Sequence, residues 1–192
     1  MSSPRILAFA GSARRTSLNR TLAGVAAGFL REAGAEVTLI HLGDYPMPLY
    51  DGDLEASGGL PETVVRLKAQ MREHDGFLIA APEYNSSITP LLKNTIDWCS
   101  RAAPGEGPLA CYKGKVAGLV AASPGAFGGL RGLVTVRSIL GNIGVLVVPQ
   151  QFSLSKANEA FEVDGSLKDE RHAAQVRDVA FAVVRVARLP KA

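Results

Sequence analysis

Length, composition and charge exclude several classes of protein before any motif is considered. The 192 residues have a mass of 20.2 kDa, a formal net charge of +3 and an isoelectric point of about 9.0. Since 47% are hydrophobic and 20% are charged, the composition is that of a folded chain, and we expect one domain over residues 1–192. Every apolar segment is shorter than the roughly 20 residues that span a bilayer, which favours the cytoplasm and no membrane partner.

Histidine and cysteine are scarce, and their spacing excludes two further classes. There is neither a Cys-x-x-Cys pair nor a His-x-x-x-His pair, so we expect no zinc site and no disulfide framework. His41 is predicted in a strand and His74 near a helix end, both as structural residues without an evident partner, and Cys99 and Cys111 as inert thiols. Any chemistry must therefore use hydroxyl groups, carboxylates, backbone groups or a bound cofactor.

Strand-like and helix-like segments alternate along the chain. Five apolar segments predict strands, at residues 5–10, 36–42, 76–81, 116–122 and 145–152. Apolar residues at helical spacing predict helices at residues 18–30, around 64–71, at 89–101, at 130–140 and around 176–187. The long loops are expected at residues 44–61, 102–114 and 155–167.

This alternation predicts an α/β fold with a parallel sheet between two layers of helices. Right-handed crossovers then give a doubly wound sheet of either the flavodoxin-like or the Rossmann-like kind. Five strands in a chain of this length favour the flavodoxin-like order 2-1-3-4-5. Ligands of such sheets bind beyond the carboxyl ends of the strands, which directs attention to the loops after strands 1, 3 and 4.

The loop after the first strand has the composition of an anion site. Residues 11–19 hold three hydroxyl side chains and two arginines, and the loop leads directly into a helix N-terminus. It is neither a Walker A loop nor a Gly-x-Gly-x-x-Gly turn, and neither cysteine begins a Cys-x5-Arg phosphatase loop. The sequence predicts that this loop binds a phosphate, and the alternative is an ordinary polar loop in which Ser17 caps the helix.

The loops after the third and fourth strands suit a flat ring with a polar edge. Pro82 and Pro90 stiffen the first of them, in which Tyr84 offers an aromatic face and Asn85 offers hydrogen bonds. The second loop, residues 123–129, has three glycines that let the backbone approach a ligand closely. A phosphate, a chain and a ring are thus expected to lie across one edge of the sheet.

Three motifs in this order resemble the NADPH-dependent FMN reductase family, which includes bacterial quinone and chromate reductases. They are Gly-Ser-x-Arg-x-x-Ser-x-Asn at 11–19, Pro-Glu-Tyr-Asn at 82–85 running into Lys-Asn-x-Ile-Asp-Trp at 93–98, and Ser-Pro-Gly-x-x-Gly-Gly at 123–129. The resemblance covers about residues 4–150 and implies bound FMN. It assigns the FMN phosphate to Ser12, Arg14, Ser17, Leu18 and Asn19, the isoalloxazine to Pro82, Glu83, Tyr84 and Asn85, and its pyrimidine side to Ser123 and Gly125.

The resemblance also implies an activity. It predicts an oxidoreductase that takes hydride from NADPH or NADH at flavin N5 and reduces quinones, azo compounds, chromate or free flavin by a ping-pong mechanism. No catalytic side chain is expected, although Tyr84 could line the substrate pocket. Glu83 is expected to act mainly through its backbone, since a carboxylate beside a reduced, anionic flavin is unfavourable.

The sequence also bears on subunit contacts and leaves two other functions open. Residues 46–53 resemble a segment that approaches the flavin of a neighbouring subunit, which implies a homodimer or a dimer of dimers. A flavodoxin-like electron carrier is one alternative, although such carriers are strongly acidic and this chain is not. A non-catalytic binding protein is the other, without nucleic acid, since no basic stripe with interleaved aromatics occurs.

Several other residues are predicted to be structural. Lys93 and Asp97 are spaced as a surface ion pair on one helix, and Arg15 either meets the adenosine phosphates of the donor or is solvated. The apolar residues Leu92, Ile96 and Trp98 are expected in the core or in a dimer interface.

Overall fold

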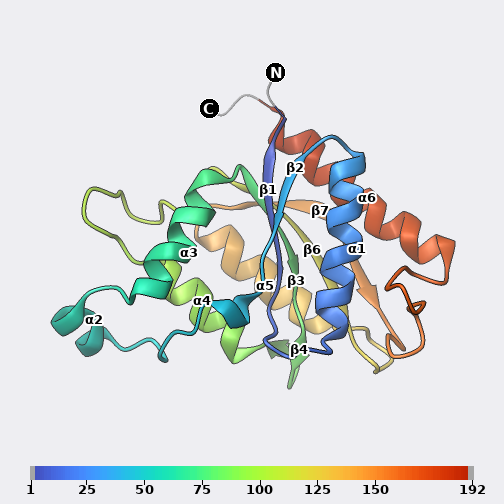
Figure 1. Cartoon of the computed structure of the whole chain (residues 1–192), viewed down its shortest axis with the longest axis horizontal. Coiled ribbons are helices and arrows are strands. Elements are labelled where there is room, and N and C mark those ends of the chain that lie inside the picture. Colours follow the sequence, from blue (N-terminus) through green and yellow to red (C-terminus); the bar gives the residue numbers. More distant parts are fainter. Residues whose placement is uncertain (1–2, 190–192) are drawn as a thin grey trace.

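Five parallel strands form the central sheet of the computed structural model, which describes residues 3–189 (Figure 1). Their order across the sheet is β2-β1-β3-β6-β7, which confirms the flavodoxin-like order predicted from the sequence. The predicted domain of residues 1–192 extends beyond the described residues at both ends. The strands are β1 (Arg5–Ala10), β2 (Glu36–Leu39), β3 (Gly76–Ala80), β6 (Val116–Ala122) and β7 (Leu146–Leu154).

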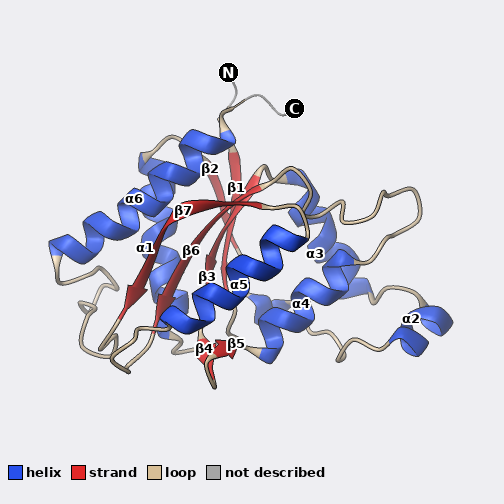
Figure 2. Ribbon diagram, turned by 180° about the vertical axis from the view of Figure 1, so that it is seen from behind, coloured by secondary structure: helices blue, strands red, loops and turns tan. Residues whose placement is uncertain are grey.

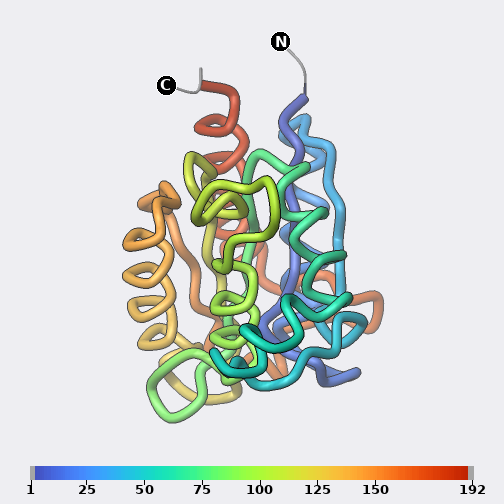
Figure 3. The backbone as a smooth tube through the Cα atoms, turned by 90° about the vertical axis from the view of Figure 1, so that its left-hand side faces the viewer, coloured from blue at the N-terminus to red at the C-terminus, as the bar shows by residue number. Residues whose placement is uncertain are grey.

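Helices cover both faces of the sheet, as Figure 2 shows. One layer consists of α1 and α6, and the other of α3, α4 and α5, onto which Figure 3 looks. The helices are α1 (Leu18–Glu32), α2 (Gly52–Gly58), α3 (Glu62–Glu73), α4 (Pro90–Ser100), α5 (Leu130–Asn142) and α6 (Glu170–Ala187).

Alternation along the buried strands supplies the two halves of the core. In β1, Ile6 and Ala8 pack toward α1 and α6, whereas Leu7 and Phe9 pack toward the other layer. All four side chains are at most 3% exposed, because a central parallel strand is covered on both faces. The continuous apolar runs in β1, β3 and β6 are therefore explained by their central position.

The second strand and the loop after it depart from the sequence prediction. Strand β2 ends at Leu39, and residues Leu42–Asp44 form a 3-10 turn, so the prediction that His41 lies in a strand was wrong. Leu42 is 1% exposed and packs against the α3 side of the core, which pulls the chain away from the sheet edge.

The predicted loop at 44–61 also contains helix α2, which stands apart from the sheet in Figure 1. This short helix has no buried residue, and the side chain of Asp51 caps it by accepting a hydrogen bond from the backbone N–H of Asp53 at 2.8 Å. Without a buried face it has no apolar periodicity for a sequence reading to detect.

Most residues predicted to be structural behave as expected. Leu92, Ile96 and Trp98 are at most 4% exposed, and Lys93 Nζ lies 2.7 Å from Asp97 Oδ1. Burial raises the pKa of both Cys99 and Cys111, in agreement with inert thiols. Within residues 3–189 no helix is long and apolar enough to cross a bilayer, and no group of three metal-binding side chains gathers.

His74 differs from the prediction in having two partners. Its Nδ1 lies 2.6 Å from the carbonyl oxygen of Gln70, and its Nε2 lies 2.8 Å from Thr38 Oγ1. The neutral ring satisfies both contacts, with Nδ1–H donating to the carbonyl and Nε2 accepting from the hydroxyl. A histidine at the C-terminal end of α3 is thereby fastened to strand β2.

Candidate functional site

Three loops meet at the carboxyl edge of the sheet, at the lower end of the strands in Figure 1. They follow β1, β3 and β6, which are adjacent in the sheet, and we call them the first loop (11–17), the hairpin loop (81–89) and the glycine loop (123–129). Every residue predicted to bind the cofactor lies in these loops or in the first turn of α1. The structure therefore brings the predicted set together at one edge.

The first loop offers both the helix cap and the anion donors that the sequence suggested. Ser17 caps α1, its Oγ accepting from the backbone N–H of Arg20 at 3.4 Å, and Ser12 Oγ accepts from the N–H of Arg14 at 3.3 Å. Leu18 and Asn19 open the helix, where backbone N–H groups have no acceptor within the helix. Arg14 is exposed beside them, so capping and anion binding can coexist in this loop.

The side chain of Asn19 is engaged by the protein itself. Its Nδ2 donates to the carbonyl oxygen of Ala122 at 2.8 Å, and its Oδ1 accepts from the N–H of Ala122 at 2.9 Å. Ala122 is the last residue of β6, directly before the glycine loop. The predicted contact of Asn19 with phosphate thus depends on its backbone N–H, while its amide joins the first loop to the glycine loop.

The hairpin loop contains two short antiparallel strands, β4 (Glu83–Tyr84) and β5 (Ser87–Ile88). Asn85 and Ser86 form the turn with φ of +50° and +66°, a left-handed conformation that Asn tolerates better than most residues. Tyr84 is 48% exposed at the start of this turn, and Pro82 is buried beneath it. The turn holds Tyr84 and Asn85 out from the sheet edge, where a ligand can reach them.

Glu83 turns its carboxylate toward α5. Oε1 accepts from Arg131 Nε at 2.8 Å, and Oε2 accepts from the backbone N–H of Gly132 at 3.1 Å. The carboxylate is therefore satisfied within the protein, in agreement with the expectation that Glu83 meets a cofactor through its backbone.

The glycine loop contains two glycines that its backbone conformation requires and one that it does not. A Cβ on Gly128 would lie 2.7 Å from the carbonyl carbon of Leu154, and a Cβ on Gly129 would lie 2.8 Å from the Cβ of Ala121. Both glycines also have positive φ, so their freedom serves the turn itself. Gly125 is exposed, and its N–H donates to Ser123 Oγ at 3.1 Å. The interpretation of close ligand approach thus applies to Gly125 alone.

A third bridge completes the connections between the loops. Thr89 Oγ1 donates to the carbonyl oxygen of Gly11 at 2.7 Å and also accepts from the N–H of Leu92, which caps α4. Thr89 thus joins the hairpin loop to the first loop, Asn19 joins α1 to the end of β6, and Glu83 joins the hairpin loop to α5, the helix that follows the glycine loop. Thr89 was not predicted as a site residue, although a threonine before proline is typical of a helix N-cap. Arg131 was not predicted either, because no local sequence pattern indicates its contact with Glu83.

The model of one protein family, described as NADPH-dependent FMN reductase, matches residues 4–159. The chain belongs to this family. An NAD(P)H-dependent FMN reductase of Pseudomonas aeruginosa is 35% identical over 168 residues, which cover 87% of this chain and 86% of that protein. An NAD(P)H:quinone oxidoreductase of Solanum tuberosum is 32% identical over 186 residues, covering 95% and 92% of the two chains.

A solved structure of a flavoenzyme has a similar fold. FerB, a flavoenzyme NAD(P)H:(acceptor) oxidoreductase from Paracoccus denitrificans, is similar with a TM-score of 0.79 and 30% identity over 96% of this chain and 97% of that chain. Membership of the FMN reductase family confirms the resemblance read from the three motifs. It also confirms the prediction of an oxidoreductase that uses FMN and a nicotinamide donor.

The segment at residues 46–53 is bound to α4 by hydrogen bonds. Asn94 Nδ2 and Trp98 Nε1 both donate to the carbonyl oxygen of Pro48 at 2.8 Å, and Asn94 Oδ1 accepts from the N–H of Tyr50 at 2.8 Å. Leu49, between these anchors, is 77% exposed. The segment is thus held by its backbone and presents an apolar side chain outward.

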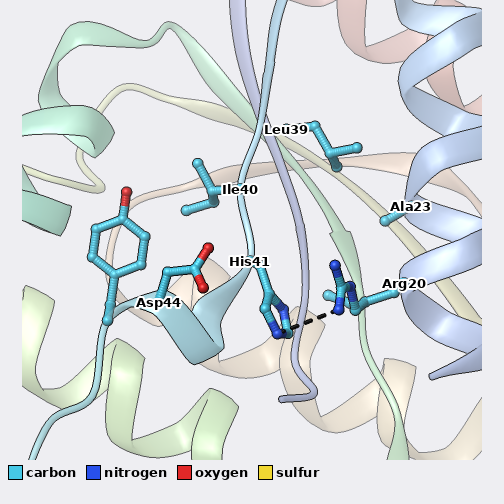
Figure 4. A pocket seen from close by; sticks show the side chains of 8 residues that line it. Arg20, Ala23, Leu39, Ile40, His41 and Asp44 are labelled. Atoms are coloured by element: carbon cyan, nitrogen blue, oxygen red, sulfur yellow. Dashed lines mark hydrogen bonds between the residues drawn. The ribbon is translucent and has the colours of Figure 1, made fainter. Parts of the chain in front are cut away.

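A cavity of about 360 Å³ lies beside the first loop, between the ends of β1 and β2 and the start of α1 (Figure 4). Its walls combine apolar side chains such as Leu39 and Ile40 with Arg20, His41 and Asp44. Arg20 Nη1 lies 3.4 Å from His41 Nε2, and because arginine can only donate, Nε2 is the acceptor. None of the residues predicted to bind the cofactor lines this cavity.

Proposed function

We propose that this protein passes electrons from NAD(P)H, through FMN held by the three loops, to a quinone or a similar small acceptor such as an azo compound, chromate or free flavin. The proposal rests on the convergence of the three loops at one edge of the sheet, where Asn19 and Thr89 form buried hydrogen bonds between neighbouring segments and Glu83 joins the hairpin loop to α5. Relatives named as FMN reductase and as quinone oxidoreductase support this range of acceptors.

The residues at the edge of the sheet fit FMN by their chemistry. Hydroxyl groups of Ser12 and Ser17, the guanidinium of Arg14 and the N–H groups that open α1 are donors suited to a phosphate dianion. The outward turn of the hairpin loop offers an aromatic face and an amide to the polar ring. In this assignment the ring lies between the hairpin loop and the glycine loop, with Pro82, Ser123 and Gly125 beside it.

FMN supplies the redox chemistry when it is bound, because its isoalloxazine accepts a hydride and later releases the electrons. The protein orients the ring and leaves one face open to donor and acceptor in turn, so we propose ping-pong kinetics. Tyr84, 48% exposed at the rim, is the residue best placed to contact both substrates. No side chain of the chain has to exchange a proton with either substrate.

Absorbance and steady-state kinetics test the proposal directly. The purified protein should bind added FMN, NADPH or NADH should bleach it without a second protein, and a panel of quinones should restore the colour. A protein that fails to bind FMN would sink the proposal. One that binds FMN and is bleached only through another reductase would be the flavodoxin-like electron carrier instead.

A double substitution tests the phosphate assignment. Arg14→Ala with Ser17→Ala removes two anion donors, and since each charge-assisted hydrogen bond contributes about 1.5–3 kcal/mol, FMN affinity should fall at least roughly tenfold. Arg31→Ala, at the opposite end of the same helix, is the matched control and should leave FMN affinity unchanged. Unchanged affinity in the double variant would make the phosphate assignment wrong.

We propose a homodimer or a dimer of dimers, supported by the exposed Leu49 on the anchored segment at 46–53. The cytoplasm is the proposed location. Light scattering of the FMN-loaded protein would measure the mass, and a monomer at micromolar concentration would contradict the proposed assembly.

A further inference from the structure

The bridge from the hairpin loop to α5 differs from the other two because it uses an ion pair. Arg131 Nη2 lies 2.7 Å from Glu83 Oε1, to which Arg131 Nε also donates. The Glu83 side chain is only 8% exposed, whereas that of Arg131 is 56% exposed. The carboxylate is thus buried at the junction, and the guanidinium covers it from the solvent side.

Glu83 also completes a helix that lacks a cap of its own. The N-cap of α5 is Gly129, which has no side chain, and the first turn of α5 contains no acidic residue. Glu83 Oε2 accepts from the N–H of Gly132 in that turn, so a carboxylate from another loop supplies the missing acceptor and meets the positive end of the helix dipole. The helix and the hairpin loop are therefore stabilised by the same side chain.

The backbone at this junction is packed without spare room. A Cβ on Gly132 would lie 3.3 Å from the Cβ of Glu83 and 3.4 Å from the carbonyl oxygen of Ser87. The hairpin loop therefore rests directly on the first turn of α5. Its position relative to the glycine loop is set by this contact and by the ion pair above it.

Arg131 reaches one further residue at the rim. Its guanidinium carbon lies 5.2 Å from the ring centroid of Phe127, whose side chain is 62% exposed in the glycine loop. A cation over an aromatic face is attractive, so Arg131 contacts the hairpin loop through Glu83 and the glycine loop through Phe127.

We propose that Glu83 and Arg131 act as one positioning unit, which fixes the hairpin loop against the glycine loop and so sets the width of the ring site. The Glu83 carboxylate then acts through Arg131 and Gly132, without contacting the cofactor. This inference rests on the proposed function, since the ring site is the one assigned there to FMN.

A double-mutant cycle on FMN affinity tests the unit. Glu83→Gln keeps an acceptor for the Gly132 N–H but removes the charge, and Arg131→Gln removes the partner while leaving an exposed position that folding tolerates. Because both changes break the same contact, each should weaken FMN binding by about tenfold, and the double variant by about tenfold as well. Arg137→Gln, on the same helix but bound to Gln151, is the matched control and should bind FMN as the unchanged protein does.

Riboflavin provides a readout that loss of the phosphate contacts would not reproduce, and the urea midpoint of each variant shows that it is folded. Riboflavin lacks the phosphate, so breaking the unit should weaken riboflavin and FMN by the same factor, whereas Arg14→Ala with Ser17→Ala should weaken FMN alone. The absorbance band of FMN bound to the Glu83 and Arg131 variants should also shift, because the surroundings of the ring change.

Distinct results would overturn the inference. Multiplied effects in the double variant, or an Arg131→Gln variant with unchanged FMN affinity, would mean that Glu83 acts independently of Arg131. Loss of FMN affinity with riboflavin affinity unchanged would place the effect at the phosphate. An unsubstituted protein that binds neither flavin would instead overturn the proposed function, and the inference with it.

Discussion

Cationic side chains have partners within the protein at the amino edge of the sheet, whereas those of the first loop, at the carboxyl edge, are open to solvent. At the amino edge Lys68, 2% exposed, lies 2.9 Å from Glu106 Oε2, and Lys115 Nζ donates to the backbone carbonyl oxygens of Arg72 and His74. At the carboxyl edge Arg14 and Arg15 are exposed, and neither takes part in an ion pair among the described residues. The first loop thus keeps its cations available where an anionic ligand is expected, while buried cations at the amino edge are satisfied within the protein.

The largest expected effect tests the amino edge. Glu106→Ala would leave the ammonium of Lys68 buried without its carboxylate, which should lower the free energy of unfolding by about 3–5 kcal/mol. FMN affinity should change by less than about twofold, because distant sites act independently. Urea unfolding and FMN titration of the same preparation measure both quantities.

An exposed pair at the same edge is the control for Glu106. Arg5 Nη2 lies 3.3 Å from Glu73 Oε2 with both side chains about half exposed, so Glu73→Ala should lower the free energy of unfolding by less than about 1 kcal/mol. If Glu106→Ala changed FMN affinity as strongly as stability, the separation between the two edges would be wrong.

The next effect tests whether the hydrogen bonds between Asn19 and Ala122, at the carboxyl edge, contribute both to stability and to FMN binding. Asn19→Ala removes two buried hydrogen bonds and leaves the N–H and carbonyl of Ala122 unpaired, which should cost about 2–3 kcal/mol in the free energy of unfolding. FMN affinity should fall as well, since the first loop loses its connection to the glycine loop. Asn158→Ala, at an exposed position, should change neither quantity.

Much of this architecture could be predicted from the sequence because the relevant signals are local. The continuous apolar runs of β1, β3 and β6 predicted buried parallel strands, and the polar segment after β1 predicted a loop at a helix N-terminus. Helix α2 and the early end of β2 were not predictable in this way. Both depend on how the chain leaves the edge of the sheet, and the spacing of apolar residues in the sequence does not indicate this.

The residues of the candidate site also differ in whether the sequence alone could predict their role. Ser12, Arg14, Ser17 and Tyr84 could be predicted as ligand contacts, because hydroxyl, guanidinium and aromatic groups after a strand suggest binding by their own chemistry. The bridges could not, because Asn19 and Ala122 are 103 positions apart and Glu83 and Arg131 are 48 apart. A side chain whose partner is a distant backbone atom carries no local signal, so Asn19 was predicted as a ligand contact although its amide is used within the protein.

A smaller effect concerns pH at the amino edge. Burial lowers the pKa of His74 below its ordinary value of 6.5, with further lowering by the charges of Arg5 and Lys115 against the hydrogen bond to Gln70. The native state therefore favours the neutral ring, and this stabilisation is present above pH 6.5 and lost as the pH falls through the lower pKa of the folded state.

Replacing the histidine separates this contribution from acid effects elsewhere. His74→Gln should be less stable than the unchanged protein at neutral pH, and the difference in urea midpoint should shrink as the pH falls below 6.5. Burial opposes the ionised form of Glu106, but the hydrogen bond and charge of Lys68, with the charge of Arg72, hold the pKa of that carboxyl below its ordinary value. The stability that the Lys68–Glu106 ion pair contributes is therefore lost only at more acidic pH. If the difference in urea midpoint between His74→Gln and the unchanged protein stayed constant with pH, the prediction for His74 would be wrong.

The smallest effect lies between the two edges, on the outer face of α4. Lys93 and Asp97 are 49% and 34% exposed, so a double-mutant cycle with Lys93→Ala and Asp97→Ala should give a coupling of about 0.3–0.5 kcal/mol that weakens further in salt. A coupling above about 1 kcal/mol would be too large for a solvated pair. Such a value would show that the pair is desolvated in solution, as it would be beneath a second subunit of the proposed homodimer, and in that case it should fall when the protein is diluted.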